Sequence, residues 1–262
     1  MEQPRSVNVA VQPVTSLWRD EPGMLEVRSG LGVAGLNGFL YAAGGNRGDG
    51  RMKSAERLDC APGGERRWQA LPDMKQARSN FALVALGGKV YAVGGFDGVQ
   101  RLQSVEVYDP LSHRWKACAP MQAPREGLGC VAVEGLGAEP CLVAVGGFDG
   151  TRVLRSAERY DPGLDRWTML PSMLQRPRSF LGAVCLEGLV FAIGGQDDTG
   201  AMLDSVEVYG TPSQLSDAAM PVATLSGSVR GGGSGSVEAA VWAEYEAMRL
   251  PAPMCNFSAC VV

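Results

Sequence analysis

Four arginines that recur about every 50 residues are the strongest candidates for chemistry in this sequence. They are Arg28, Arg78, Arg125 and Arg178, and three are followed by a serine, namely Ser29, Ser79 and Ser179. A planar guanidinium binds a carboxylate or a phosphate through two parallel hydrogen bonds, and a neighbouring hydroxyl supplies another donor. If equivalent positions face the same way, the sequence predicts a ring of anion-binding groups.

Residues for catalysis or metal binding are scarce. His113 is the single histidine, and it stands in a predicted turn between Pro110 and Trp115. The seven cysteines form no CxxC pair, which favours reduced and packed thiols over a zinc site or a disulfide framework. The run Gly30–Gly35 matches GxGxxG, but a strand rather than a helix is expected after it, which argues against a dinucleotide. We therefore predict no catalytic residue, no metal and no cofactor.

Composition excludes several other classes of protein. The chain has 262 residues and a net charge of -4, which argues against a nucleic-acid partner. No apolar run approaches the roughly 20 residues of a membrane span, and the first residues do not resemble a signal peptide, so we expect a cytoplasmic protein. Glycine (35) and proline (16) are abundant, which favours many short strands joined by tight turns.

An internal repeat of about 50 residues organises the chain. Glycine doublets close strand-like runs at Gly44-Gly45, Gly94-Gly95, Gly146-Gly147 and Gly194-Gly195. A glutamate follows each doublet in phase, at Glu56, Glu106, Glu158 and Glu207, and tryptophans recur at Trp18, Trp68, Trp115 and Trp167. We expect each glutamate to accept hydrogen bonds from backbone or arginine near the junction of two units. We expect Trp68, Trp115 and Trp167 to occupy equivalent sites between units.

Each unit predicts a four-stranded antiparallel sheet. In the first unit the strands are expected near residues 30–36, 39–43, 54–58 and 66–69, and the later units repeat them. The fold class is therefore all-β, with four consecutive sheets.

These elements carry a family resemblance. The glycine doublet, the run Ser104–Pro110, Trp115 and Pro171-Ser172-Met173, at their spacing, resemble the kelch repeat, a blade of a β-propeller. The phrase Gly-Gly-Phe-Asp-Gly at residues 94–98 and 146–150 is most similar to the kelch-like proteins, substrate adaptors of cullin-RING ubiquitin ligases. The resemblance implies about six blades, so this chain, with four recognisable ones, is expected to be an incomplete propeller.

The repeat also suggests domain boundaries. An N-terminal segment covers residues 1–17, and kelch repeats cover 18–209, with units at about 28–77, 78–124, 125–177 and 178–209. Residues 210–249 read as an insertion with a Gly/Ser linker and a possible short helix, because Val237, Val241, Tyr245 and Met248 recur at helical spacing. Residues 250–262 resemble the start of a further repeat.

The resemblance implies a partner-binding face. In kelch-like adaptors, the recurring arginines with their serines and the loop after the glycine doublet line the substrate face. The matching loop residues here are Asn46, Arg47, Phe96, Asp97, Phe148, Asp149, Gln196 and Asp197. The alternative for the four arginines is structural, with each guanidinium bonding loop carbonyl groups to hold the blades together.

The function expected from these observations is noncatalytic binding of a protein or peptide, and an acidic one would suit the recurring arginines. The resemblance implies the substrate-recognition propeller of a ubiquitin-ligase adaptor, in which a separate BTB region, absent from this chain, contacts the ligase. An actin-associated or scaffolding kelch protein is the alternative, and a propeller enzyme is a more remote one. We expect neither a nucleic-acid nor a membrane partner.

Overall fold

The computed structural model describes residues 20–134, 139–217 and 240–244 of the chain. Their secondary structure is almost entirely β, in four antiparallel sheets of four strands. The first two sheets contain β1 (Gly32–Leu36), β2 (Phe39–Ala43), β3 (Ala55–Asp59) and β4 (Trp68–Leu71), then β5 (Ala82–Leu86), β6 (Lys89–Val93), β7 (Val105–Asp109) and β8 (Arg114–Cys118). The sheets and their strands agree with the sequence prediction.

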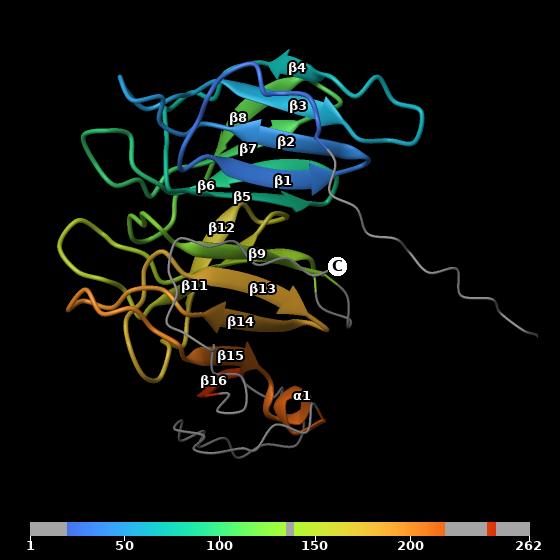
Figure 1. Cartoon of the computed structure of the whole chain (residues 1–262). Coiled ribbons are helices and arrows are strands. Elements are labelled where there is room, and N and C mark those ends of the chain that lie inside the picture. Colours follow the sequence, from blue (N-terminus) through green and yellow to red (C-terminus); the bar gives the residue numbers. More distant parts are fainter. Residues whose placement is uncertain (1–19, 135–138, 218–239, 245–262) are drawn as a thin grey trace, which may run out of the picture.

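The last two sheets repeat this order. They contain β9 (Gly129–Val133), β10 (Cys141–Val145), β11 (Ala157–Asp161) and β12 (Arg166–Leu170), then β13 (Gly182–Leu186), β14 (Leu189–Ile193), β15 (Val206–Gly210) and β16 (Val241–Glu244). Strands that follow one another along the chain are neighbours in each sheet. The sheets follow one another in sequence order from the top to the bottom of Figure 1. We call them blades 1 to 4.

The first strands of the blades, β1, β5, β9 and β13, lie next to one another along the inner side of this array. The glycine doublets make the close approach possible. At Gly94 the backbone has φ of +66°, and an added Cβ would lie 2.6 Å from the carbonyl oxygen of Arg125 in the segment that enters blade 3. A side chain at this position would therefore both strain the backbone and force the blades apart.

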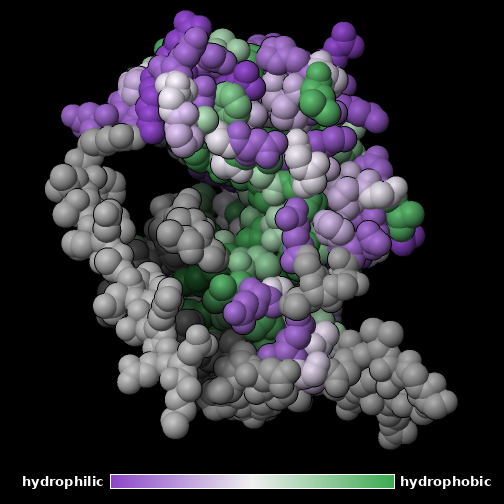
Figure 2. Space-filling view, turned by 90° about the vertical axis from the view of Figure 1, so that its right-hand side faces the viewer, coloured by the Kyte–Doolittle hydropathy of each residue, from purple (hydrophilic) through white to green (hydrophobic). Residues whose placement is uncertain are grey.

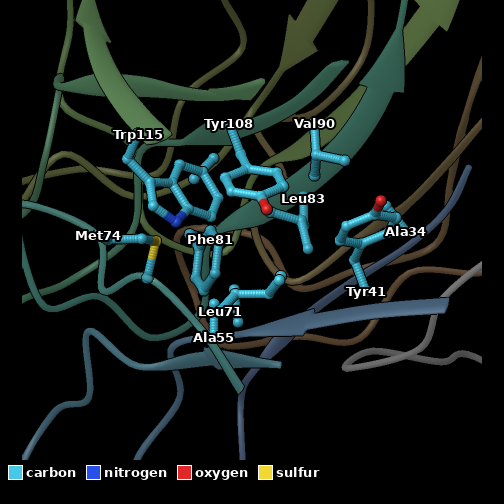
Figure 3. Close-up of a cluster of buried hydrophobic side chains, with 12 residues drawn as sticks. Ala34, Tyr41, Ala55, Leu71, Met74, Phe81, Leu83, Val90, Tyr108 and Trp115 are labelled. Carbon is cyan, nitrogen blue, oxygen red and sulfur yellow. The ribbon is translucent and has the colours of Figure 1, made fainter. Parts of the chain in front are cut away.

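Apolar side chains fill the spaces between blades. Between blades 1 and 2, Tyr41 and Leu71 pack with Phe81, Tyr108 and Trp115, as Figure 3 shows. Equivalent clusters join blades 2 and 3 and blades 3 and 4. Because each sheet buries a face only against its neighbour, the blades depend on one another for stability.

The tryptophans fix this packing, as the sequence suggested. The indole nitrogen of Trp115 donates to the carbonyl oxygen of Pro72, in the segment that leaves blade 1, at 2.9 Å. Trp167 makes the same bond to Ala119 at 3.1 Å, and Trp68 bonds to Pro22 at 2.9 Å. Each tryptophan thus ties the outer strand of its blade to the segment that enters it.

Blade 4 differs from the sequence expectation. Residues 241–244, within the proposed helix, form the outer strand β16, in which Trp242 lies opposite Tyr209 and donates to the carbonyl oxygen of Pro171 at 2.8 Å. The short run fits both the helix and the strand periodicity. A strand here pairs with the open edge of β15, whereas a short isolated helix has little stability in water. The described helix is α1 (Pro212–Asp217) instead. Val237, Tyr245 and Met248, like residues 1–17 and 250–262, lie outside the described residues.

Candidate functional site

The recurring arginines are interior residues. The side chains of Arg78, Arg125 and Arg178 are 0% exposed, and that of Arg28 is 1% exposed. Nη1 of Arg78 donates to the carbonyl oxygens of Gly94 (2.7 Å) and Ser104 (3.2 Å), and Nη2 donates to Glu106 (2.8 Å). Burial lowers the pKa of the Arg78 guanidinium, and the hydrogen bond to Glu106 opposes that shift. The arginine therefore stays charged and paired inside the blade.

The same pairing recurs in every blade. Arg28 bonds to Glu56 at 2.9 Å, Arg125 to Glu158 at 2.9 Å and Arg178 to Glu207 at 2.9 Å. Each arginine also donates to the first glycine of its own doublet, at 2.7 to 3.0 Å. The arginine recurs in the sequence because each of the four blades needs the same set of buried contacts.

The glutamates confirm the structural role expected for them. The carboxylate of Glu106 accepts the backbone N–H groups of Lys75 (2.7 Å) and Gln76 (3.1 Å), in the segment that joins blades 1 and 2. Glu56, Glu158 and Glu207 accept the equivalent backbone donors. Each carboxylate thus attaches the connecting segment to the blade that follows it.

These contacts correct the expectation that the four arginines line a partner-binding face. A partner cannot reach guanidinium groups that are fully buried and already bonded to carboxylates and carbonyl groups. Ser79 and Ser179 are buried with them, whereas Ser29 is exposed. The structure therefore favours the alternative, in which the arginines hold the blades together.

Three predicted loop carboxylates mainly shape their own loops. Oδ1 of Asp97 accepts the N–H groups of Val99 and Gln100, each at 2.8 Å, and Asp149 does the same for Thr151 and Arg152. Asp197 is 4% exposed and accepts the Thr199 hydroxyl (2.7 Å), two backbone N–H groups and Arg176. These bonds, above all that from Thr199, lower the pKa of Asp197 to about 2.

The loops after the glycine doublets bring the remaining predicted residues to one end of the blades. We call residues 46–51, 96–101, 148–153 and 196–202 the mouth. Asn46, Phe96, Phe148 and Gln196 occupy equivalent positions there, because each forms a bridge with the residue that follows the buried arginine. All four are half-buried, while Arg47 is exposed and bonds to Asp49 at 3.1 Å.

Two functional candidates in the mouth were missed by the sequence reasoning. Arg51 and Arg101 each bridge back to the first loop residue of their own blade, Asn46 and Phe96. The guanidinium groups of Arg51 and Arg101 both lie near the ring of Phe96. The distance from the guanidinium carbon to the ring centroid is 5.1 Å for Arg51 and 4.7 Å for Arg101. Arg101 also lies 5.0 Å from the ring of Phe148. Both arginines stand at the same spacing after a glycine doublet, Gly44-Gly45 or Gly94-Gly95, and this shared spacing could have identified them.

A cavity of about 710 Å³ lies between the first strands of the four blades. Asn80, Phe180 and Gln196 contribute to its lining. Asn80 and Phe180 have φ near +50°, which is uncommon for a bulky side chain such as that of Phe180.

Seen from the side of the β1–β2 turn, hydrophobic residues gather at the centre of the molecule, with polar ones above and below (Figure 2).

A family model for the Kelch motif matches residues 28–75, 77–122, 138–174 and 177–210, which is more than half of the chain. The chain belongs to the kelch-repeat family. The first two matched ranges each cover one four-stranded sheet, while the third begins after β9 and the fourth ends at β15, before the outer strand β16.

Several curated relatives are named kelch-like proteins. Kelch-like protein 13 of Mus musculus is 31% identical over 101 residues, which is 37% of this chain and 14% of that protein. Kelch-like protein 35 of Mus musculus is 37% identical over 95 residues, 36% of this chain and 16% of that protein. The influenza virus NS1A-binding protein homolog of Mus musculus is 35% identical over 82 residues, 31% of this chain and 12% of that protein. The matches thus span less than a fifth of each relative's length.

A solved structure shares the fold. The chain titled "Structure of YjhT" superposes with a TM-score of 0.60 at 16% sequence identity, over 72% of this chain and 64% of that one. The kelch motifs and the shared fold together identify the four sheets as blades of a β-propeller.

His113 and the GxGxxG segment are both part of the blade framework. Nδ1 of His113 lies 2.7 Å from the Tyr108 hydroxyl in the β7–β8 turn, away from the mouth. Residues 32–35 of the GxGxxG segment lie in β1, so the helix N-terminus that a dinucleotide phosphate needs does not follow. Within residues 20–134, 139–217 and 240–244 no three His, Cys, Asp or Glu side chains gather as a metal site would require, and no described helix could cross a membrane.

Proposed function

We propose that this chain is a noncatalytic interaction module whose mouth binds a segment of a partner protein. One observation carries the proposal: the buried frame of arginine, glutamate and tryptophan is nearly the same in all blades, while the exposed loop positions differ. A binding surface needs such variation, because a partner contacts several blades at once and each contributes different side chains. Arginine and aromatic residues, which dominate the energetics of many interfaces, occupy the mouth.

We further propose that the module selects substrates for a cullin-RING ubiquitin ligase. The support is the similarity to kelch-like proteins 13 and 35. In this role the ligase is contacted by a BTB region outside this chain. The free cysteines Cys60, Cys118, Cys130, Cys141 and Cys185 suit a reducing compartment, so we propose a cytoplasmic location.

Comparative affinity capture tests this function. The chain and a Phe96→Ala/Phe148→Ala variant are expressed in cells and purified, and their partners are quantified by mass spectrometry. We expect at least one protein to be recovered with the wild type and reduced about tenfold with the variant, because two aromatic contacts are removed. An Arg57→Gln variant, which changes a residue stacked on Phe39 outside the mouth at 4.3 Å, serves as the control.

The adaptor role has its own readout. The recovered partner should become ubiquitinated when this propeller is expressed on one chain with a BTB region. Partner binding without ubiquitination would leave the module as a scaffolding protein. Equal recovery with the wild type and the mouth variant would contradict the proposed function.

A further inference from the structure

Two backbone hydrogen bonds recur wherever one described blade follows another. In the first, the second glycine of a doublet donates its N–H to the carbonyl oxygen of the buried arginine that enters the next blade. The pairs are Gly45 and Arg78 (2.8 Å), Gly95 and Arg125 (2.8 Å), and Gly147 and Arg178 (2.9 Å). One bond of this kind therefore closes each of the three junctions between blades 1 and 4.

The second bond links residues that stand two positions after the arginines, on the wall of the central cavity. The N–H of Asn80 donates to the carbonyl oxygen of Gly30 at 2.8 Å, that of Gly127 to Asn80 at 2.8 Å, and that of Phe180 to Gly127 at 2.6 Å. Each blade thus donates to the blade before it and accepts from the blade after it. Together the two bonds set the register of one blade against the next.

Blade 4, at the lower end of the array in Figure 1, presents both groups again. Among the described residues, the N–H of Gly195 has no acceptor and the carbonyl oxygen of Phe180 has no donor. The backbone of Gly195 has φ of +94°, close to the +96° to +103° of the three glycines that make the first bond. Blade 4 is therefore shaped to bind a further entry segment through its backbone.

Helix α1 covers a different part of blade 4. Leu215 of α1 is 1% exposed and lies beside Gly210, where its Cδ2 atom would be 3.7 Å from an added Cβ. Gly210 is the last residue of β15, whereas Gly195 lies at the opposite end of the sheet, just beyond Ile193 in β14. The helix thus leaves the two unpaired groups uncovered.

Residues 253–257 have the sequence features of an entry segment. A proline directly precedes the arginine in blades 3 and 4, at Pro124 and Pro177, and Pro253 is its equivalent. The pair Asn256-Phe257 repeats Asn80-Phe81 of blade 2. In this alignment, residue 256 is the position that donates the second bond.

The length of chain also fits. Asn256 stands 14 residues after Trp242 of the outer strand β16. In the three described junctions the same spacing is 12, 12 and 13 residues, from Trp68 to Asn80, from Trp115 to Gly127 and from Trp167 to Phe180. A segment tethered this closely to β16 has a high effective concentration beside blade 4.

Met254 stands where the other entry segments have arginine. Each buried arginine needs a glutamate of its own blade, such as Glu207 for Arg178 at 2.9 Å. A methionine side chain can be buried without a charged partner, and its backbone carbonyl oxygen is still an acceptor. The exchange keeps the first backbone bond and removes the need for a buried ion pair.

We infer that residues 254–262 dock against blade 4 as a fifth inner strand. The carbonyl oxygen of Met254 accepts the N–H of Gly195, and the N–H of Asn256 donates to the carbonyl oxygen of Phe180. This inference goes beyond the proposed function, because it assigns a place to a segment outside the mouth. The docked segment closes blade 4 and extends the wall of the central cavity.

Hydrogen exchange of single backbone amides, measured by NMR on the full chain, tests this inference with two substitutions at one position. Asn256→Pro removes the N–H donor and excludes the φ of +51° to +62° that the four equivalent residues adopt. Asn256→Gly is the matched control, because Gly30 and Gly127 occupy the equivalent position in blades 1 and 3. The amide of Gly147, already bonded to Arg178, is the internal reference.

We expect the Gly195 amide to be protected in the wild type and in Asn256→Gly, and to exchange at least about tenfold faster in Asn256→Pro, because local opening exposes an amide that has lost its partner. Gly147 should be equally protected in all three chains, which shows that the blades stay folded.

Three results would overturn the inference. They are fast exchange of the Gly195 amide in the wild type, protection that the proline leaves unchanged, and protection that is lost on dilution. The last result would assign the site to a second copy of the chain, which could offer the carbonyl oxygen of its Arg28 and the N–H of its Gly30. Each of these results leaves the proposed function of the mouth standing, since partner capture tests that function separately.

Discussion

The buried arginines and the mouth arginines use the same side chain for opposite purposes. Arg125 lies beneath the mouth with all of its charge compensated by Glu158 and by carbonyl oxygens of Gly146 and Ser156. Arg101 lies in the mouth, with its side chain 32% exposed and its Nε donating to Glu126 at 3.0 Å. In this kelch array, an arginine that recurs in every blade builds the fold, and we propose that arginines present in only some of the blades serve recognition.

The difference has a physical origin. Each blade must place a doublet, a connecting segment and an outer strand in the same relation to its neighbour, so the contacts that do this are repeated. The mouth is less constrained, because the loops of blades 2 to 4 are shaped mainly by their own aspartates, Asp97, Asp149 and Asp197. Loop side chains such as Arg101 and Val153 can therefore differ without disturbing the frame.

The largest expected effect comes from breaking a buried pair. Arg125→Ala should reduce the free energy of unfolding by about 3–5 kcal/mol, because Glu158 would be left as a buried charge without its main partner. Urea denaturation measures this. The double variant Arg125→Met/Glu158→Leu should recover part of the loss, since it removes both charges. A loss below about 1 kcal/mol for Arg125→Ala would contradict the structural role.

Truncating a tryptophan between blades should have a similar effect where the side chain is fully packed. Trp167 is 4% exposed, so Trp167→Ala should cost about 3–5 kcal/mol of stability. Trp68 makes the equivalent hydrogen bond but is only half-buried, and Trp68→Ala should therefore cost less. Equal losses at the two sites would show that burial does not set the energy of this contact.

A smaller effect is expected from the loop aspartates and depends on pH. The folded pKa of Asp197, about 2, is below the unfolded value of about 3.9, so its ionised form stabilises the fold. This contribution is present above about pH 4 and is lost as the pH falls toward 2. Asp197→Asn should be less stable than the wild type at pH 6, and the difference should shrink with falling pH.

Unfolding measured from pH 6 to pH 2 tests this prediction. The exposed neighbour provides the control Asp198→Asn, which removes a carboxylate and leaves the bonds to Asp197 in place. A difference for Asp197→Asn that does not change with pH would contradict the assigned role.

Periodic features were predictable from the sequence, and features that depend on tertiary context were not. Doublets, glutamates and tryptophans at one phase predicted the blades and the role of Glu106, because each repeats a local requirement. The periodicity could not show that Arg78 points inward, since a ring of arginines on a surface has the same spacing. Trp242 was separated from Tyr209 by an unusually long segment, and only the open edge of β15 explains why residues 241–244 form a strand.

The sequence also concealed the mouth arginines. Arg51 and Arg101 occur in two units and are replaced by Val153 and Met202 in the others, so a search for recurring residues passes over them. Their stacking on Phe96 appears only when the loops of neighbouring blades are brought together. Variation at a structurally equivalent position is the more useful signal for recognition in a repeat protein.

The most direct test of this account measures stability and binding together for one arginine of each kind. Arg125→Lys and Arg101→Gln are compared by thermal unfolding and by the affinity of a mouth-binding peptide per folded molecule. We expect Arg125→Lys to lose stability, because an ammonium cannot reproduce the planar fork, and to bind the peptide normally. We expect Arg101→Gln to lose less stability than Arg125→Lys, because a glutamine amide can still donate to Glu126, and to bind several-fold more weakly. The reverse ranking, with binding lost at Arg125 and stability lost at Arg101, would contradict the division between a repeated frame and a variable mouth.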